Sequence, residues 1–388
     1  MKHRLCLPFI VAVLCMSLPA CQEDMESRSF VSKFRVLGVQ TTPPEAIAGD
    51  AVAVSGIFAP VKGQAASVAF VTVDTEWIAQ TLGPILPDNV DTFTTAELKE
   101  LMNALMSLQG QTSEAAAPQD VLTPQFKAVV VPVNDVTGVA TLPAENLPIS
   151  PALIAVMKLL EQDGGLPVYL LACSNGTIDT RKLLGDVNHL TDSQAIGDLG
   201  AACKGPNATA LVAFKAVNIR LAGDSAANTD PLNLNPRIQT FQIEKKTHPP
   251  NSPPGETGKM ICKGTDGCRD PFRFQVSVHK EDFQYFQGFE RRENEMEKMF
   301  VSWFSNGGEF SNSRIRSDDA QVAADAMMAG NSAPLDQILA DPQRNHWFAV
   351  DWLPPVEGGV FDVWIVVNDL RGGIGYARYK IRAQARNY

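Results

Sequence analysis

The chain has 388 residues, of which 43 are acidic and 33 are lysine or arginine, and its formal net charge at pH 7 is −10. Nucleic-acid binders need a basic face, and proteins that bind membranes by charge need a polybasic segment, so this composition argues against both classes. A hydrophobic fraction of 45% is ordinary for a globular protein, and the length is typical of two domains.

The N-terminal residues have the pattern of an export signal. Basic residues at positions 2–4 precede the apolar run Leu5–Leu18, and the segment ends in Leu-Pro-Ala-Cys at Cys21. A membrane-spanning helix needs about 20 apolar residues, so this run is too short to cross a bilayer. We therefore expect residues 1–20 to be a signal peptide that is removed on export.

The Leu-x-Ala-Cys ending resembles the lipobox of bacterial lipoproteins. In that family the cysteine becomes the first mature residue and carries lipid, including palmitate. The resemblance implies lipidation of Cys21 and an anchor in the outer membrane of a Gram-negative bacterium, on either its periplasmic or its surface face. Residues 21–29 are polar and suit a tether between the lipid and a folded body. An ordinary signal cleaved just before Gln22 would instead leave a soluble secreted protein.

The remaining cysteines predict disulfide bonds. Once Cys6 and Cys15 leave with the signal and Cys21 is assigned to lipid, the body contains Cys173, Cys203, Cys262 and Cys268. An even number in an exported chain is typical of disulfides, and four cysteines allow three pairings. We expect Cys173–Cys203 and Cys262–Cys268, because each pair is local and lies within one proposed domain. A zinc site is the alternative, but no Cys-x-x-Cys occurs, and no histidine lies near a cysteine at metal-finger spacing.

Residues 30–221 are expected to form a first β-sandwich domain. Two strands, 34–40 and 51–58, are separated by a Pro-Pro-Glu turn and a Gly-Asp turn. Their apolar residues alternate, which is typical of a sheet with one buried face. Further strands are predicted at 68–73, 126–133, 138–142, 166–173 and 208–221, with 126–133 and 138–142 forming a hairpin around Asn134-Asp135.

Two helices interrupt the first domain. Thr94 and Glu97 form a capping box at the start of a run that places leucines at helical spacing up to Leu108. A second helix begins at Ser150-Pro151, where proline suits the first helical position. The simpler interpretation is that these helices cap one end of the sandwich; the alternative is that they form a ligand-binding rim.

The stretch 222–236 is polar and lacks periodicity, so we place a linker there. A second sandwich domain is expected over residues 237–388. Its strands are predicted at 238–243, 272–278, 299–304, 347–352, 359–367 and 373–383, with an insertion containing short helices at 318–339.

The C-terminal sequence carries the clearest family likeness. The tryptophan strand Val301–Ser305 precedes a Gly-Gly turn, and the segment Trp352–Pro355 leads to the strand Gly359–Asn368 and a turn with Arg-Gly-Gly at 371–373. This pattern resembles the PKD-like and immunoglobulin-like modules of bacterial surface proteins over residues 299–384. The likeness implies two immunoglobulin-like β-sandwich domains with inserted short helices. A fold of this kind does not by itself supply a function.

Two groups of residues have both a structural and a functional interpretation. The tryptophans at 303, 347, 352 and 364 are expected to pack in the core, with an exposed platform for sugar or peptide as the alternative. The charge-rich stretch 290–298 is expected to be a solvated helix or loop, with a docking edge for a partner as the alternative.

The sequence contains none of the catalytic motifs that we sought. Histidines at 189, 248, 279 and 346 are widely spaced, and neither His-Glu-x-x-His nor Gly-x-Ser-x-Gly occurs. Oxygen donors at Asp318, Asp319, Asp362 and Asp369 lack the spacing of a calcium loop, and Asp369 is expected to bind backbone amides of its own turn. We therefore expect no catalytic residue, no metal and no cofactor.

Together these features predict a lipid-anchored envelope protein that is a binding or structural module for a protein or glycan and is not an enzyme. Its expected partners are the membrane, through the lipid on Cys21, and a protein or glycan of the envelope, with no nucleic acid. Two alternatives stay open: an accessory subunit of an envelope secretion or adhesion complex, and a hydrolase with an unrecognised site.

Overall fold

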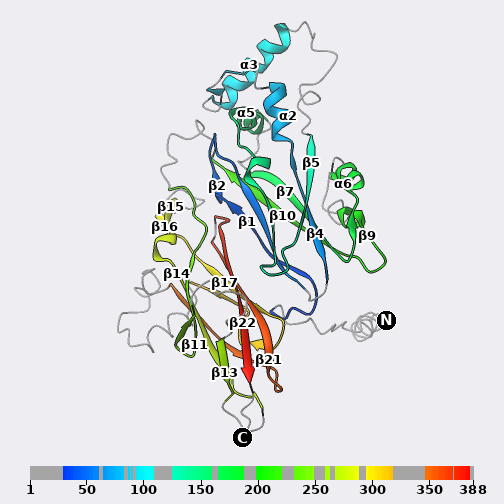
Figure 1. Cartoon of the computed structure of the whole chain (residues 1–388). Coiled ribbons are helices and arrows are strands. Elements are labelled where there is room, and N and C mark those ends of the chain that lie inside the picture. The colour runs from blue at the N-terminus through cyan, green and yellow to red at the C-terminus, as the bar shows by residue number, and fades with distance from the viewer. Residues whose placement is uncertain are drawn as a thin grey trace, which may run out of the picture.

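The computed structural model describes residues 29–60, 64–82, 86–87, 89–90, 93–108, 125–159, 165–187, 198–220, 231–248, 258–262, 267–287, 294–317, 346–369 and 371–384. These residues form a mainly β structure in which two sandwich-like units follow one another along the long axis of the molecule (Figure 1). The expectation of a mainly β chain is therefore confirmed.

The first unit packs a three-stranded sheet on a five-stranded sheet. The smaller sheet has the order β1-β3-β6 and contains β1 (Arg35–Thr42), β3 (Ala53–Ala59) and β6 (Val139–Leu142). The larger has the order β2-β10-β7-β4-β5 and contains β2 (Glu45–Ala46), β4 (Ala66–Val73), β5 (Phe126–Pro132), β7 (Gly165–Ser174) and β10 (Thr209–Ile219). Only β2 and β10 pair in parallel within these two sheets.

Apolar residues from both sheets form the core of the first unit. Phe34 stacks on Phe58 with ring centroids 5.4 Å apart, and Phe70 is fully buried beside them in the same core. The central strands β4 and β7 are apolar on both faces, because α6 (Thr180–Val187) and η4 (Leu199–Ala202) cover their outer side. Next to this cover, the short strands β8 (Thr177–Ile178) and β9 (Cys203–Lys204) pair with each other.

The predicted hairpin between 126–133 and 138–142 is wrong. Both strands are present, but β5 pairs with β4 and β6 pairs with β3, so they belong to opposite sheets. The chain does reverse after Asn134, whose N–H donates to the carbonyl of Val139. Turn residues set this local reversal, whereas the sheet that each strand joins depends on partners distant in sequence.

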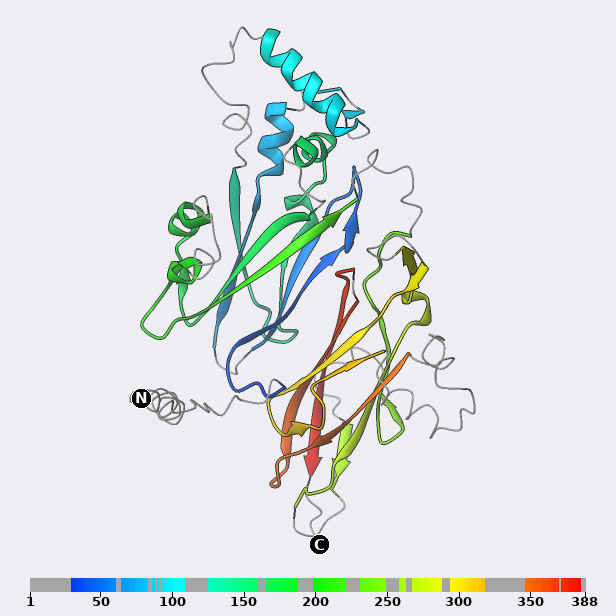
Figure 2. The same cartoon turned by 180° about the vertical axis from the view of Figure 1, so that it is seen from behind.

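Helices lie together at the outer end of the first unit (Figure 2): α2 (Thr75–Leu82), α3 (Thr95–Leu108) and α5 (Pro151–Leu159). The predicted capping box is present, since the Glu97 carboxylate accepts from the N–H of Thr94 at 2.7 Å and the Thr94 hydroxyl accepts from the N–H of Glu97 at 3.3 Å. Lys158 of α5 is buried and donates to the Phe93 carbonyl at 2.8 Å. The helices therefore cap the sandwich, as the simpler interpretation predicted.

The second unit packs two five-stranded sheets face to face. One has the order β12-β11-β14-β20-β18 and contains β11 (Ile238–Ile243), β12 (Lys246–His248), β14 (Phe272–Val278), β18 (Glu309–Phe310) and β20 (Trp347–Leu353). The other has the order β13-β22-β21-β17-β19 and contains β13 (Gly258–Ile261), β17 (Phe300–Ser305), β19 (Arg314–Arg316), β21 (Gly359–Asn368) and β22 (Ile374–Gln384). The short strands β15 (Tyr285–Gln287) and β16 (Asn294–Met296) form a separate ribbon. A single 3₁₀ turn, η5 (Lys280–Asp282), follows β14, and a similar turn in the first unit, η3 (Ala144–Asn146), precedes α5.

Aromatic side chains fill the core of the second unit. Trp303 and Trp352 are fully buried, and Phe274 lies between them with ring centroids 6.5 Å and 5.3 Å away, respectively. The indole N–H of Trp352 donates to the carbonyl of Gly307 at 3.1 Å, which holds the turn after β17 against β20. Core packing, the first interpretation of these two tryptophans, is confirmed.

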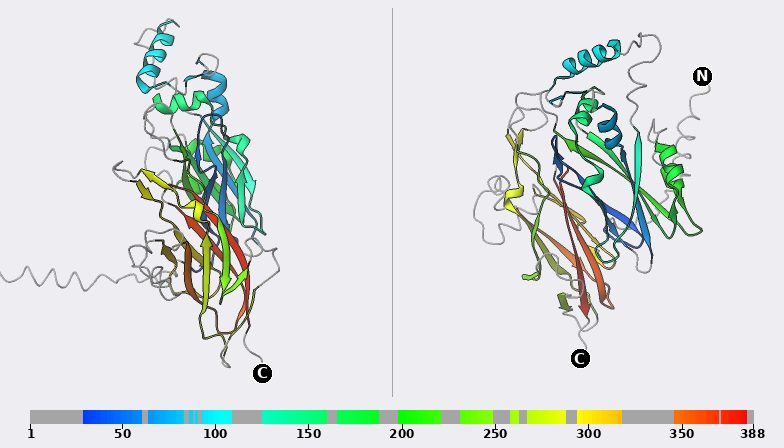
Figure 3. Two further views of the ribbon diagram at one scale, coloured as in Figure 1. Left: turned by 90° about the vertical axis from the view of Figure 1, so that its left-hand side faces the viewer. Right: turned by 45° about the horizontal axis from the view of Figure 1, so that its top comes forward.

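The outer faces of two sheets, one from each unit, pack against each other. Leu37 of β1 and Ile57 of β3 meet residues of the β17–β21–β22 face that include Trp364, Val366 and Ile374. Trp364 is 2% exposed but belongs to this interface and not to the core of the second sandwich. In the side view the helical cap lies at one end of the molecule and the C-terminal strands lie at the other (Figure 3).

The N-terminal segment joins the second unit before the chain enters the first. Phe30 forms a parallel bridge with Ser305, the last residue of β17. The N–H of Val31 donates to the Ser305 carbonyl at 2.8 Å, and the N–H of Ser305 donates to the Ser29 carbonyl at 2.9 Å. Val31 also packs with Ala59 of the first unit, so both units hold the point at which the N-terminal segment meets the folded body.

Part of the charge-rich stretch 290–298 departs from its prediction. Residues 294–296 form β16, and Glu297 is 1% exposed, so this glutamate is not part of a solvated helix or loop. The insertion predicted at 318–339 lies outside the described residues, as does most of the linker. Within the described part of the chain, none of the helices combines the length and the apolar character that crossing a membrane requires.

Candidate functional site: the junction between the two units

The loop between β21 and β22 lies at the centre of a polar junction. Asp369 organises this loop, because its Oδ1 accepts from the N–H of Arg371 at 2.8 Å and from the N–H of Gly373 at 2.7 Å. Gly372 has φ of +96°, a backbone conformation that favours glycine. The predicted role of Asp369 in its own turn is therefore confirmed.

Arg371 extends from this loop to the first unit. One of its terminal nitrogens, Nη2, donates to Glu45 Oε2 at 2.9 Å and to the Pro231 carbonyl at 2.7 Å. The other, Nη1, donates to the Gln284 side chain at 3.2 Å. The planar guanidinium thus connects β2 of the first unit, the linker and the second unit with fixed geometry.

Glu45 is the acceptor that this network shares. Arg220, just after β10, donates to both Glu45 oxygens at 3.0 and 2.9 Å, and the Asn233 backbone N–H donates to Oε2 at 2.8 Å. The side chains of Glu45, Arg220 and Arg371 are only 13–16% exposed. A carboxylate removed from water in this way is stable only because several donors compensate for its lost hydration.

Backbone carbonyls of the loop are bound from the first unit. Lys215 Nζ donates to the Gly372 carbonyl and Asn218 Nδ2 donates to the Arg371 carbonyl, both at 2.6 Å. Asn235 of the linker donates to the Thr41 carbonyl at 2.7 Å and accepts from the N–H of Ile374 at 2.9 Å. Strands β1, β10 and β22 and the linker are therefore joined at one place.

Two buried carboxyl groups lie beside the network with unpartnered oxygens. Among the described residues, Glu297 Oε1 and Asp369 Oδ2 have no hydrogen-bond partner of good geometry. The pKa of Glu297 is raised to about 8, because burial and then the nearby Asp369 carboxylate raise it more than Arg371 lowers it. Burial also raises the pKa of Asp369, against the backbone N–H donors that lower it. One of these acids can therefore hold a proton at neutral pH.

The junction also contains a lysine, Lys215, whose pKa is lowered. Burial lowers the pKa of Lys215, and the nearby Asp369 carboxylate opposes this effect. Among the described residues, no three His, Cys, Asp or Glu side chains gather in a way that could hold a metal ion. The described groups of the junction therefore form ion pairs between the two units, and the carboxyl groups of the second unit can bind a proton.

A small apolar cavity lies near the N-terminal segment. Its volume is about 430 Å³, and it is lined by Phe30, Gly308, Glu309 and the run Leu353–Val356. Leu353 and Val356 at its rim are 40% and 51% exposed. The cavity combines apolar walls with one carboxylate, and it lies where the N-terminal segment meets the second unit.

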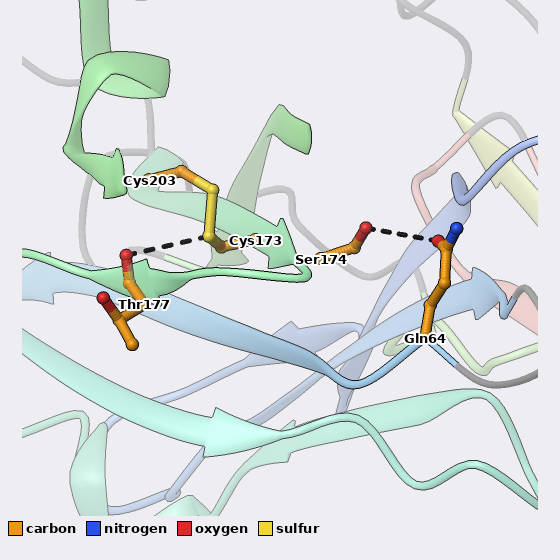
Figure 4. Close-up of a disulfide and its surroundings, with 5 residues drawn as sticks. All are labelled: Gln64, Cys173, Ser174, Thr177 and Cys203. Carbon is orange, nitrogen blue, oxygen red and sulfur yellow. Dashed lines mark hydrogen bonds between the residues drawn. A yellow bond between two sulfur atoms is a disulfide. The ribbon is translucent and has the colours of Figure 1, made fainter. Parts of the chain in front are cut away.

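The structure pairs the four body cysteines as predicted. Cys173 bonds to Cys203, joining the end of β7 to β9 (Figure 4), and Cys262 bonds to Cys268 in the second unit. Cys173 Sγ lies 3.8 Å from the Thr177 carbonyl oxygen, and the neighbouring Ser174 hydroxyl donates to Gln64 at 3.4 Å. Each bridge lies within one unit, so neither crosses the junction.

Other residues considered from the sequence lie in different places. Cys21 and the pair Asp318-Asp319 are outside the described residues. Asp362 accepts from Arg378 Nε at 3.2 Å, in an ion pair on the outer face of the second unit. Trp347 is only partly buried, next to His346. The structure thus does not bring Asp362 and Asp369 together in one site.

Sequence reasoning missed the residues that make the junction: Glu45, Arg220, Asn233, Gln284, Glu297 and Arg371. Glu45 and Arg371 are 326 positions apart in the chain, and no short motif connects them. One signal was present in the sequence. Glu45 follows two prolines and Arg371 precedes two glycines, so each charged residue lies in a turn.

Comparison with known proteins leaves the family open. No protein-family model matches the chain, and no curated protein matches it. Among solved structures, the chain is similar to red sea bream transglutaminase, with a TM-score of 0.23, 10% identity, and coverage of 92% of this chain and 32% of that one. It is also similar to dimeric latent PorU from Porphyromonas gingivalis, with a TM-score of 0.20, 9% identity, and coverage of 92% and 24%.

A third similar structure is the Yersinia pseudotuberculosis adhesin InvE, with a TM-score of 0.17, 8% identity, and coverage of 88% of this chain and 58% of that one. This chain therefore spans less than two thirds of each of these proteins. Likeness at this level carries no argument about activity.

Proposed function

We propose that this chain is a lipid-anchored protein of the Gram-negative cell envelope that contacts a protein or glycan partner through immunoglobulin-like domains and does not act as an enzyme. The observation that carries the proposal is the place where the N-terminal segment meets the body. Ser29 and Val31 are hydrogen-bonded to Ser305 at the junction of the two units, directly after a short polar tether that begins at Cys21.

A tether fixed at this place would control how the body is presented. Residues 21–29 follow a cleavable leader and contain few apolar side chains, so they suit a spacer outside the core. Because Phe30 bridges to β17 and Val31 packs with Ala59 and Trp364, a pull on the tether acts on both units together. This arrangement suits a protein that holds a binding surface at a set distance from a membrane.

The junction supports a rigid module. Polar contacts join the β21–β22 loop around Arg371 to β2 and β10 of the larger sheet of the first unit, and apolar contacts join Ile57 of the smaller sheet to Val366 and Ile374. A rigid body lowers the ordering cost of binding, since fewer degrees of freedom are lost when a partner docks. Immunoglobulin-like domains that serve as binding modules depend on such rigid scaffolds.

The test is chemical identification of the mature N-terminus in protein isolated from membranes. Mass spectrometry is expected to find Cys21 as the first residue with acyl mass attached. Cys21→Ser is expected to accumulate as the uncleaved precursor, with Cys15→Ser as a matched control that is processed normally. A mature chain that starts at Gln22 without lipid would overturn the anchor.

The partner is tested with the anchored protein. Crosslinking in intact cells, followed by affinity purification through the C-terminus, is expected to recover one main envelope protein or glycan. Recovery of a large assembly of several subunits would favour an accessory role in an envelope complex. Recovery of the chain alone would contradict a role in binding.

A further inference from the structure

Strand β10 forms one edge of the larger sheet of the first unit, and most of that edge has no partner strand among the described residues. Its neighbour β2 pairs only with the last two residues of β10, Asn218 and Ile219. On its other side β10 pairs with β7 along nearly its whole length without a bulge. None of residues 209–216 is buried, whereas Val217 is. We name the stretch 209–216 the open edge.

The register shows which main-chain groups of the open edge point away from the sheet. In antiparallel pairing, every second residue directs its N–H and C=O to the partner strand, and the residues between direct theirs to the opposite side. Asn175, just after β7, donates its N–H to the carbonyl of Ala65, just before β4, so the odd residues of β7 face β4 and the even ones face β10. The even residues of β7 lie opposite odd residues of β10. Four residues of β10 therefore point their N–H and C=O outward: Ala210, Val212, Phe214 and Ala216.

A hydrogen bond at the end of the strand agrees with this assignment. The same alternation points Arg220 outward, and its N–H donates to the Ala46 carbonyl of β2 at 2.8 Å. Within the part of the chain that the structure describes, the outward groups of the four residues in the open edge have no such partner. Main-chain groups in this arrangement can pair with an extended segment of another chain.

The open edge lacks the features that usually protect a strand from such pairing, which are proline, charged side chains and bulges. Residues 209–214 contain none of them, and Lys215, which follows, is bound to the Gly372 carbonyl. The opposite edge of the same sheet, β5, does have protection, because it contains Lys127 and Pro132. Of these two edges, β10 is therefore the one suited to pairing.

An aromatic pair lies beside the open edge. Phe214 is 52% exposed, and its ring centroid lies 5.4 Å from that of Tyr169, the residue opposite it on β7. Val212 is two positions away and lies on the same face of the sheet. A strand added to β10 would direct every second side chain to this face, where aromatic and β-branched residues pair favourably. The face therefore favours apolar residues at alternate positions of the added strand.

Both ends of the open edge are bounded. At one end, a Cβ added at Gly200 of η4 would lie 3.5 Å from the Cβ of Ala210. At the other, the β21–β22 loop binds the Asn218 side chain, so the open edge continues directly from the junction of the two units. Antiparallel pairing of two copies about Val212 would place Pro206 of one copy opposite Asn218 of the other, where this loop is bound. A short segment that ends before the loop avoids the obstruction.

We propose that the open edge of β10 binds an extended segment of a partner protein, which pairs as an added strand and directs alternate apolar side chains to the face of Phe214. This inference rests on the proposed function and deepens it, because it makes the partner a protein and not a glycan. Main-chain hydrogen bonds to Val212 and Phe214 supply the affinity, and the alternate side chains supply the selectivity.

The experiment measures peptide binding to the chain from Gln22 to Tyr388, exported behind a cleavable non-lipoprotein leader so that both disulfides form. The probe is the fluorescently labelled peptide acetyl-Ser-Thr-Val-Thr-Val-Thr-Val-Ser-amide, with each threonine N-methylated so that only one edge of the peptide can pair. Its valine N–H groups and valine side chains then match the outward groups and the Phe214 face of β10. Fluorescence anisotropy is expected to show binding, and the same peptide with every residue N-methylated is expected not to bind.

Val212→Pro removes an N–H that points outward, so the hydrogen bonds between β10 and β7 are kept. We expect it to weaken peptide binding at least about tenfold, through loss of main-chain hydrogen bonds. Phe214→Ala, which leaves the main chain unchanged, is expected to weaken binding about threefold. The matched control is Val130→Pro on β5, which also points outward, because Val133 donates to the Ala66 carbonyl and the alternation follows from there. This control is expected to retain binding, and urea denaturation checks that each variant is folded.

Binding that is lost in Val130→Pro and kept in Val212→Pro, binding of the fully methylated peptide, or no binding by the parent chain would overturn the inference. A dimeric parent that Val212→Pro converts to a monomer would show instead that a second copy occupies the open edge. Capture of a glycan partner in cells, unchanged by Val212→Pro, would remove this inference and leave the proposed function standing. Mass spectrometry of Cys21 tests the anchor separately, so failure of one proposal is distinguishable from failure of the other.

Discussion

Arg371 donates to Glu45 at 2.9 Å, and this contact joins the β21–β22 loop of the second unit to β2 of the first. Both side chains are mostly buried, and both have further partners in the linker. The pair joins two adjacent sandwiches into one body. Separating the two side chains would leave each charge buried without the partner that compensates for its lost hydration.

Loss of this arginine is expected to be costly. Arg371→Ala removes the donor to the Gln284 side chain and leaves Glu45 and the Pro231 carbonyl with Arg220 as their remaining side-chain donor. Because this breaks a buried ion pair, we expect a loss of about 3 kcal/mol in the free energy of unfolding. Urea denaturation measures this value. Lys182→Ala, which breaks a more exposed pair within one helix, is the control and is expected to cost about 0.5 kcal/mol. Equal effects of the two substitutions would contradict a structural role for the junction.

Stability is expected to fall as the solution becomes alkaline, because of Glu297. Its pKa is raised from 4.5 to about 8, so the folded chain holds a proton that the unfolded chain releases. This contribution to stability is fully present below about pH 4.5 and is lost as the pH rises through about 8. The slope that one such group adds between these values is at most about 1.4 kcal/mol per pH unit.

Glu297→Gln removes the proton linkage at this position. We expect this variant to lose part of the pH dependence and to be more stable than the parent at alkaline pH, as measured by urea denaturation across the range. Glu357→Gln changes an exposed carboxylate and serves as the control. Parallel curves for the parent and Glu297→Gln would show that this carboxyl group does not hold a proton in the folded chain.

Cleavage of the linker is expected to leave the two units associated. After cleavage at a protease site placed within residues 222–230, the contacts of Arg371, Lys215 and the apolar sheet faces still join the units. After cleavage, both fragments are expected to elute together in size-exclusion chromatography and to separate in denaturant. In the same cleavable chain, Ile57→Asp places a charge in the apolar contact with Val366 and Ile374 and is expected to release the fragments. Fragments that separate without it would mean that the contacts are too weak to hold the units.

The two disulfides are expected to differ in their contribution. Cys173–Cys203 closes a loop with a separation of 30 residues and Cys262–Cys268 one of 6. In the chain-entropy model these bridges stabilise by roughly 3–4 and about 2 kcal/mol, respectively. Thermal unfolding of Cys173→Ala/Cys203→Ala and of Cys262→Ala/Cys268→Ala measures the difference. A larger loss from the second pair would mean that the small loop stabilises through packing and not through chain entropy.

Features that depend on neighbours in the chain were predictable. The capping box at Thr94 and Glu97, the strands with alternating apolar residues and the turn organised by Asp369 all depend on groups within a few residues of each other. The disulfide pairing followed the same logic, since the nearest cysteines in each domain are the ones that bond.

Features that depend on distant partners were not predictable. Trp303 and Trp364 both lie on strands with alternating patterns, yet one fills the core of a sandwich and the other is covered by the first unit. Strands β5 and β6 follow one another closely but join different sheets. In each case the outcome depends on which distant surface or strand the fold places against the residue. A pattern within a few residues of the chain does not contain that information.

The amino-acid sequence by itself determined the leader pattern, the tether composition and the predominance of strands, and it favoured two of the cap helices and the cysteine pairing that the structure shows. Only the tertiary structure decided that Glu45 and Arg371 share a buried ion pair, that Glu297 is removed from water, and that Trp364 is covered by the first unit. The physical reason is that hydrogen bonds within a turn or helix form between near neighbours, whereas burial and charge clustering arise when sheet faces far apart in the chain pack together.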